Sequence, residues 1–400
     1  SNRGMYSGYS FEYSDQNPDY VKGATDRWGY YKPTSSGCNY SSGTSLPASV
    51  YPYAIQDENE ADLNIQNWNL KAVNLPSGGR IEVDYESDRY RYVQHKEATI
   101  MKKVKEVRLN GGSDSSGEAD IFASGNSSNF KIGIDLDGHE IEDYLSIGDL
   151  IYFRTLVDIG EPKPDFITGY GKVSGLSSSG NMGYVQFEGV GTDGGFGTHN
   201  PMLVAALQYA RLHLSHIVYG STAIPTDAGL TLQLLEQVLN TFSNLGNIFT
   251  NPNQQIIDND RCKRMFVDKS WIKVLNPSNE KFGGGLRVKE LRMYDQWSEM
   301  TDAAIEQTVA QVKQYSYVNE DGICSGVASN EPMLGKEENA LLIPLALDEA
   351  NLLAPDNKFW IEEPFAKGFY PSPVVGYERV VVEDKQLKGS NYIDTRTGHT

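Results

Sequence analysis

The clearest pattern along the chain is an alternation of apolar and charged residues that follows a tryptophan, a proline turn and a glycine cluster. It occurs first in residues 68–85 and again in residues 271–291. A period of two predicts strands with one wet face, and glycines after a proline turn predict a tight reversal. The sequence therefore predicts two similar hairpins. The second changes phase between Val288 and Leu291, which predicts a β-bulge.

Short apolar stretches between the two copies predict a small β-module in residues 111–199. It opens with a Gly/Ser/Asp-rich stretch at 110–127, which is typical of a linker. Four strands are then expected, separated by Gly, Pro and Ser clusters, at residues 130–134, 150–158, 166–173 and 183–188. Short strands at this spacing favour a small barrel or sandwich.

Helical periodicity appears only in residues 200–265. Asn200-Pro201 predicts a helix start, with Asn as N-cap and Pro at the first helical position. Apolar residues then recur at helical spacing, and a second amphipathic stretch begins at Thr226-Asp227. We expect a helical hairpin here.

Together these patterns predict a mainly β fold with a discontinuous scaffold. Residues 1–110 form its first part and residues 266–400 its second. The β-module (111–199) and the helical hairpin (200–265) are inserted between them. A hairpin over Glu320-Asp321-Gly322 and a terminal strand at 374–383 are expected in the second part.

Composition narrows the classes of partner. The 400 residues carry a net charge of −18, which opposes binding to nucleic acid or to an anionic membrane. The 24 tyrosines suit half-buried strand faces. The sequence has no apolar run of membrane-spanning length. It starts without an initiator Met or a signal peptide, and we expect a segment of a larger polypeptide.

The three cysteines, Cys38, Cys262 and Cys324, leave at least one free thiol because their number is odd. They allow at most one disulfide, whose pairing the sequence does not choose. No Cys/His spacing supports zinc, and we expect no cofactor.

Three other groups of polar residues bear on catalysis or metal binding. Asp135 to Glu140 resembles part of a calcium loop but lacks the later ligands, so a turn is favoured. His213 and His216 lie three apart on the predicted helix, without a third metal ligand. The acid pairs Glu362-Glu363 and Glu337-Glu338 supply the carboxylates that a glycosidase needs, with nothing to fix their separation. No catalytic motif is present, and we expect no enzyme.

An aromatic turn at residues 26–33 offers the only candidate binding residues, Trp28, Tyr30 and Tyr31. Exposed aromatic rings suit stacking on a glycan or on a partner protein. The favoured interpretation is a loop held against the scaffold by these rings.

Several motifs together resemble a group of very large, uncharacterised exported proteins of Bacteroidetes-type bacteria. They are residues 26–32 (Asp-Arg-Trp-Gly-Tyr-Tyr-Lys), 75–86 (Leu-Pro-Ser-Gly-Gly-Arg-Ile-Glu-Val-Asp-Tyr-Glu), 92–94 (Tyr-Val-Gln), 283–288 (Gly-Gly-Gly-Leu-Arg-Val), 325–332 (Ser-Gly-Val-Ala-Ser-Asn-Glu-Pro), 354–357 (Ala-Pro-Asp-Asn), 362–365 (Glu-Glu-Pro-Phe) and 370–380 (Tyr-Pro-Ser-Pro-Val-Val-Gly-Tyr-Glu-Arg-Val). The final strand also resembles strands of RHS/YD-repeat (SpvB-like) shells. The resemblance implies export, with type IX secretion as its context, and a β-shell around a cavity. It brings no catalytic residue with it.

The expected function is that of a non-catalytic structural segment of a secreted or cell-surface protein, part of a β-shell or stalk. Its expected partner is the rest of the larger polypeptide. One alternative is an adhesin-like module that binds a glycan or a protein through its Tyr- and Trp-rich surface. Another is a glycoside hydrolase that uses Glu362 and Glu363.

Overall fold

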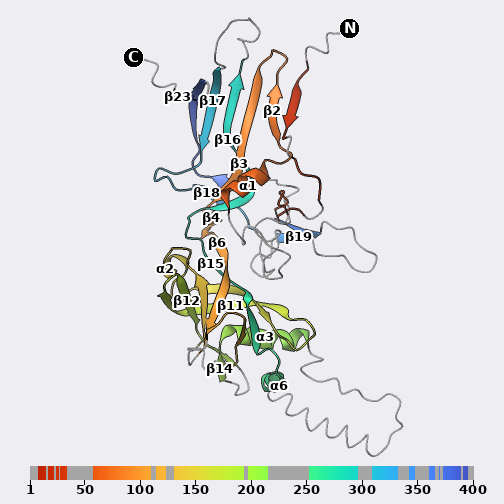
Figure 1. The fold of residues 1–400 in the computed structure, drawn as a ribbon, viewed down its shortest axis with the longest axis vertical. Helices are drawn as coiled ribbons and strands as arrows, with labels where there is room; N and C mark the ends of the chain where they lie inside the picture. The colour runs from red at the N-terminus through yellow and green to blue at the C-terminus, as the bar shows by residue number, and fades with distance from the viewer. Residues whose placement is uncertain are drawn as a thin grey trace, which may run out of the picture. The chain divides into compact units, whose positions relative to one another are not determined.

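The computed structural model describes residues 8–14, 17–21, 24–26, 28–33, 57–109, 114–122, 130–192, 197–214, 252–295, 309–331, 342–346, 360–364, 369, 373–388 and 391–394. The fold is mainly β, as predicted, and contains a closed six-strand antiparallel barrel and several sheets (Figure 1). The chain divides into two compact units. Residues 1–98 and 278–400 form one, called the sheet unit below, and residues 99–277 form the other, the barrel unit.

The barrel closes because its last strand pairs with its first. Around the barrel the order is β6 (Thr99–Arg108), β9 (Lys131–Asp135), β12 (Met182–Phe187), β11 (Asp165–Ser179), β10 (Leu150–Val157) and β15 (Arg264–Leu275), which returns to β6. Four short strands add to the unit, β7 (Asp114–Ser115) on β6, β8 (Glu118–Asp120) on β15, and a hairpin of β13 (Val190–Thr192) and β14 (Gly197–His199). Every pair is antiparallel, so the barrel leaves none of its six strands as an open edge.

Side chains fill the interior of the barrel. Phe153, Phe187 and Ile272 belong to one large apolar cluster, and all three are almost completely buried. Helix α3 (Pro201–His213) packs its apolar face into the same cluster, against β11 and β10. The barrel is thus a packed core, as is usual for a barrel of few strands. The short helices α2 (Ile141–Tyr144) and α6 (Pro252–Asp258) complete the unit.

The sequence located much of this unit. All four strands predicted within 111–199 are present, and they form a barrel. Asn200 caps α3 as predicted, because its side chain accepts a hydrogen bond from Leu203 N at 2.9 Å. Strands β6 and β15, which the sequence analysis assigned to the scaffold, complete the barrel. The predicted second helix, from 226 onward, lies outside the described residues.

The sheet unit contains two larger sheets. One has seven strands in the order β1 (Ser10–Tyr13), β2 (Leu70–Asn74), β3 (Arg80–Tyr90), β16 (Lys281–Tyr294), β17 (Val309–Ser316), β22 (Val381–Lys388) and β23 (Asn391–Asp394). The other has four, in the order β21 (Val375–Tyr377), β18 (Gly326–Ala328), β4 (Tyr92–Val93) and β5 (Lys96–Glu97). Strands β19 (Leu342–Ala346) and β20 (Trp360–Pro364) pair with each other, and helix α1 (Glu58–Ile65) packs on β3 and β16.

One of the two predicted hairpins is present. Strands β2 and β3 pair directly across the turn that contains Gly78 and Gly79. The prediction of a second hairpin is wrong, because β15 and β16 do not pair with each other. Strand β15 pairs with β6, β8 and β10, whereas β16 pairs with β3 and β17. The predicted bulge is confirmed by a shift in register between Val288 and Glu290. The predicted turn at 320–322 is also present, since Val318 bridges Cys324 across it.

The second hairpin fails because its glycines lie inside β16 rather than in a turn. Phe282 pairs with Arg89 and Leu286 with Ser87, so three glycines face the single residue Asp88. Their φ angles are 130°, 93° and 147° for Gly283, Gly284 and Gly285. L-residues adopt such angles rarely, so this glycine bulge (residues 283–285) depends on residues without a Cβ.

The glycine bulge also gives space to its neighbours. A Cβ on Gly283 would collide with the ring of Trp28, and one on Gly284 would lie 2.9 Å from Val375 Cγ2. Parts of the sheet unit that are far apart in sequence therefore meet on this bulge. A substitution here destabilises the fold in two ways, through the strained backbone angle and through the collision of the new Cβ with its neighbours.

We predict that Gly283→Ala lowers the free energy of unfolding by about 2–3 kcal/mol, because alanine is strained at this φ and displaces Trp28. Urea denaturation followed by tryptophan fluorescence measures the change. Gly376→Ala is the control, since a Cβ there meets nothing within 4 Å. Equal effects of the two substitutions would contradict the role of the bulge.

Candidate functional site

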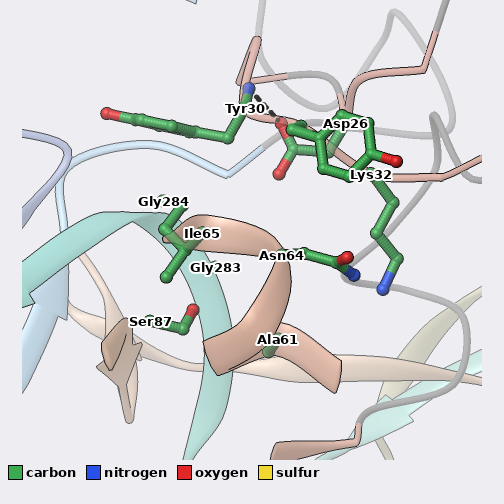
Figure 2. Close-up of a pocket in the computed structure, with 10 residues that line it drawn as sticks. Asp26, Tyr30, Lys32, Ala61, Asn64, Ile65, Ser87, Gly283 and Gly284 are labelled. Atoms are coloured by element: carbon green, nitrogen blue, oxygen red, sulfur yellow. Dashed lines mark hydrogen bonds between the residues drawn. The ribbon is translucent and has the colours of Figure 1, made fainter. Parts of the chain in front are cut away.

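The aromatic turn is organised by a buried carboxylate. Asp26 Oδ1 accepts hydrogen bonds from the backbone N–H groups of Trp28 and Tyr30, each at 3.0 Å. Figure 2 shows the bond to Tyr30, with the side chain of Lys32 running toward Asn64 on α1. Thr25 and Tyr31 bridge across the base of the turn. Local hydrogen bonding by an aspartate thus builds the loop that carries the three aromatic residues.

Burial raises the pKa of Asp26 to about 7, because removal from water disfavours its charged form. The backbone donors at Tyr30 and Trp28 and the charge of buried Lys32 act in the opposite direction and favour the carboxylate. The competing effects put the titration of this turn near neutral pH.

A cavity of about 20 Å³ lies under the turn, between Tyr31, Lys32, Asn64 and the glycine bulge. Its volume admits about one water molecule. The Nδ2 of Asn64 is buried and meets no hydrogen-bond partner among the described residues, so a water there would satisfy it. A cavity of this size takes no substrate.

A second buried polar group joins the two larger sheets of the unit. Lys281 is fully buried, and its ammonium pairs with the carboxylate of Glu331, which follows β18. The hydroxyl of Tyr90 donates to the same Glu331 Oε1 at 2.7 Å. Strands β16, β3 and the segment after β18 are thereby connected by one charged cluster. Removing either charged partner would break a buried ion pair, which is costly in the core.

A third cluster surrounds Asp88, opposite the glycine bulge. Tyr377 donates to Asp88 Oδ1 at 2.6 Å, and the guanidinium of Arg287 lies 5.3 Å from the ring of Tyr377. Burial raises the pKa of Asp88, and the hydrogen bond from Tyr377 lowers it. Burial also raises the pKa of Tyr377 above its usual range. Each acid is already held by a donor, which is the pattern of a structural network.

The structure separates the three predicted binding residues. Trp28 is 5% exposed and packs edge-on against Tyr90 in a core cluster, so its ring offers no face to a ligand. Tyr30 is half-buried. Tyr31 packs edge-on against Trp68, with 5.0 Å between ring centroids. Trp68 is 44% exposed, and the sequence analysis treated it only as the start of a hairpin.

The other sequence candidates are not brought together. Asp135 to Glu140 forms a turn between β9 and α2, as favoured, in which Asp135 accepts from Asp137 N. His213 ends α3, and His216 lies outside the described residues. Glu362 and Glu363 lie on β20, and Glu337 and Glu338 fall outside the description. Cys262 is a buried free thiol, Cys324 is also free, and Cys38 is not described.

The described part of the chain holds no cluster of three or more metal-ligating side chains. It also holds no helix long and apolar enough to cross a membrane.

Sequence reasoning missed the pairing of Lys281 with Glu331 and the exposure of Trp68. Glu331 lies in the motif at 325–332, and Lys281 lies just before the motif at 283–288. No local pattern in either motif indicated that the two residues pair. For Trp68, the amide-rich run from Asn64 to Asn69 was an available signal, because asparagine often ends helices and tolerates irregular backbone.

Comparison with known proteins adds no assignment, since the chain matches no protein-family model, no curated protein and no solved structure.

We predict that Asp26→Asn changes the pH dependence of stability. The pKa of Asp26 is higher in the fold than in the unfolded chain, where it is about 4. Its contribution to stability is therefore complete below pH 4 and is lost as the pH rises through 7. Urea denaturation from pH 4 to 8 should show wild type losing stability relative to Asp26→Asn. Asp321→Asn, in an exposed turn, is the control, and parallel curves for wild type and Asp26→Asn would contradict the assignment.

We predict that Glu331→Gln lowers the free energy of unfolding by about 3–5 kcal/mol, because it removes the carboxylate that pairs with the buried Lys281 ammonium. Lys281→Met should have a similar effect. The double variant should lose clearly less than the sum of the two, and urea denaturation measures the coupling. Additive losses would show that the two groups do not interact.

Proposed function

We propose that this chain is a non-catalytic structural segment of a large secreted or cell-surface bacterial protein, and that it forms part of a β-shell or stalk. The observation that carries the proposal is a row of paired charges that crosses the seven-stranded sheet. We call it the charge ladder. It consists of Glu12, Arg80, Glu82, Asp84, Arg292, Glu290, Gln314, Lys385 and Tyr392.

The ladder connects strands from one edge of the sheet to the other. Arg80 pairs with Glu12 of β1 at 2.5 Å and with Glu82 at 2.8 Å. Arg292 of β16 then pairs with Glu82, Asp84 and Glu290. Glu290 Oε2 accepts from Gln314 of β17 at 2.7 Å, whose Oε1 accepts from Lys385 of β22 at 2.6 Å.

The ladder also shields the sheet beneath it. Ala72 lies opposite Glu82, and Val312 lies opposite Arg292, so these small residues share a face with the ladder. Both are almost completely buried. Long charged side chains cover such residues with their aliphatic stems. The ladder therefore replaces an apolar covering layer on this face of the sheet.

The ladder shifts the titration of its acids as well. Hydrogen bonds from Arg80 and Asn74 lower the pKa of Glu12 to about 2. Burial acts to raise the pKa of Glu290, but hydrogen bonds from Gln314, Arg292 and Tyr392 lower it overall. Glu12 and Glu290 thus stay charged well below neutral pH. A network of this kind holds a sheet in register and suits a scaffold outside the cell.

The chemistry of the described sites points the same way. The cavity under the aromatic turn has room for about one water, and the buried acids Asp88 and Glu331 are each held by a donor. The barrel interior is packed with side chains. The resemblance to exported proteins supports the location at the cell surface.

The proposal is tested on the bacterium that makes the protein. Antibodies raised against residues 1–400 should label intact cells, and brief protease treatment of those cells should remove the label. Labelling only after cell lysis would overturn the proposal.

We further predict that Arg292→Ala, introduced into the full-length protein, reduces the amount displayed on the cell surface. The substitution breaks the ladder at its centre and should lower the free energy of unfolding by about 1–2 kcal/mol. Lys313→Ala is the matched control, because Lys313 forms one exposed pair with Asp384 on the same sheet. Display that is equal for the two variants would contradict the role of the ladder.

A further inference from the structure

Trp68 combines an exposed side chain with a rare backbone angle. It lies between α1 and β2 with φ at 58°, an angle that bulky residues rarely adopt. Its ring is 44% exposed. An exposed indole gains little from packing, and a strained backbone costs free energy, so neither feature is explained by stability alone.

Two contacts hold Trp68 in this conformation. Asn17 Oδ1 accepts a hydrogen bond from its backbone N–H at 2.8 Å. The ring of Tyr31 meets the indole edge-on, at an interplanar angle of 84°. The conformation is therefore set by residues from two other parts of the chain, and the indole is fixed in place before any ligand arrives.

Three residues with side-chain amides, Gln66, Asn67 and Asn69, flank Trp68 in the sequence. At the end of α1, Asn69 Nδ2 donates to the backbone oxygen of Ile65 at 2.7 Å, and Asn67 Nδ2 donates to Asn64 O at 3.2 Å. Gln66 Nε2 donates to Tyr85 O at 3.0 Å. The backbone thus uses the nitrogen end of each amide. Among the described residues, the oxygen ends of these amides accept no hydrogen bond, so they are available to hydroxyl groups.

A second exposed ring lies nearby in the register of the sheet. Tyr13 pairs with Leu70, two residues after Trp68, and Tyr13 is itself exposed. The strand register thus places a second exposed aromatic residue next to the segment that carries Trp68.

We propose that Trp68, with Tyr31 at its edge, is a binding surface for a neutral polysaccharide. The C–H face of a pyranose ring stacks on an exposed indole, and its hydroxyl groups donate to the amide oxygens of Gln66, Asn67 and Asn69. The net charge of −18 disfavours polyanions, which selects neutral sugars. The site moves the carbohydrate hypothesis from buried Trp28 to Trp68. It is independent of the structural role proposed above.

The test is affinity gel electrophoresis of the 400-residue chain with three neutral polysaccharides, a β-1,3-glucan, a β-1,4-xylan and an α-mannan, and with anionic alginate for comparison. At least one neutral polysaccharide should retard the wild type, and alginate should not. Trp68→Ala should weaken that binding at least tenfold, and Trp68→Phe should retain part of it. Tyr170→Ala is the matched control, because Tyr170 is a 40% exposed aromatic residue of the barrel unit, and its binding should equal that of wild type.

A second variant separates binding from folding. Asparagine tolerates a positive φ, so Trp68→Asn should keep a melting temperature at or above that of wild type while losing the polysaccharide. The proposal is overturned if none of the three neutral polysaccharides retards the wild type. It is also overturned if Trp68→Ala and Trp68→Asn bind as wild type does, or if Trp68→Asn unfolds at a lower temperature and the loss of binding follows that of folded protein.

Discussion

The close approach of Trp28 to the glycine bulge is the constraint on which the sheet unit depends. Three residues without a Cβ stand opposite Asp88, and the space they leave is taken by Trp28 and by Val375. Segments from the start, the middle and the end of the chain meet there. The aromatic turn, the small cavity and the contact between the two larger sheets all follow from that meeting, because any larger side chain at the bulge would force them apart.

The sequence predicted those elements whose cause is local. The alternation in residues 80–86 gave strand β3, and Asn200-Pro201 gave the start of α3. The barrel was expected from the spacing of its strands, but β6 and β15 were not assigned to it. Their pairing with each other, between residues 99–108 and 264–275, is set by closure of the barrel rather than by anything in either strand. The second hairpin was predicted wrongly for another reason. A glycine cluster is as typical of a β-bulge as of a turn, so the sequence does not distinguish the two.

The candidate site was less predictable than the fold. An aromatic turn was visible in the sequence, and the preference for a loop held by its rings agrees with the burial of Trp28. The exposed ring is instead Trp68, whose backbone angle depends on Asn17, 51 residues away. Likewise, Lys281 and Glu331 are ordinary surface residue types until the fold brings them together. Tertiary contacts of this kind leave no periodic trace in a sequence.

The distribution of charge affects both the stability of the scaffold and the ligands that its surface can bind. Arg80 and Arg292 pair with acids of the charge ladder, Lys385 pairs with Glu383, and Lys281 is buried with Glu331. Cations engaged in this way are held against carboxylates within the protein. With a net charge of −18, the chain as a whole repels anionic polymers. The binding surface proposed at Trp68 therefore relies on an exposed ring and on hydrogen-bond acceptors rather than on cations.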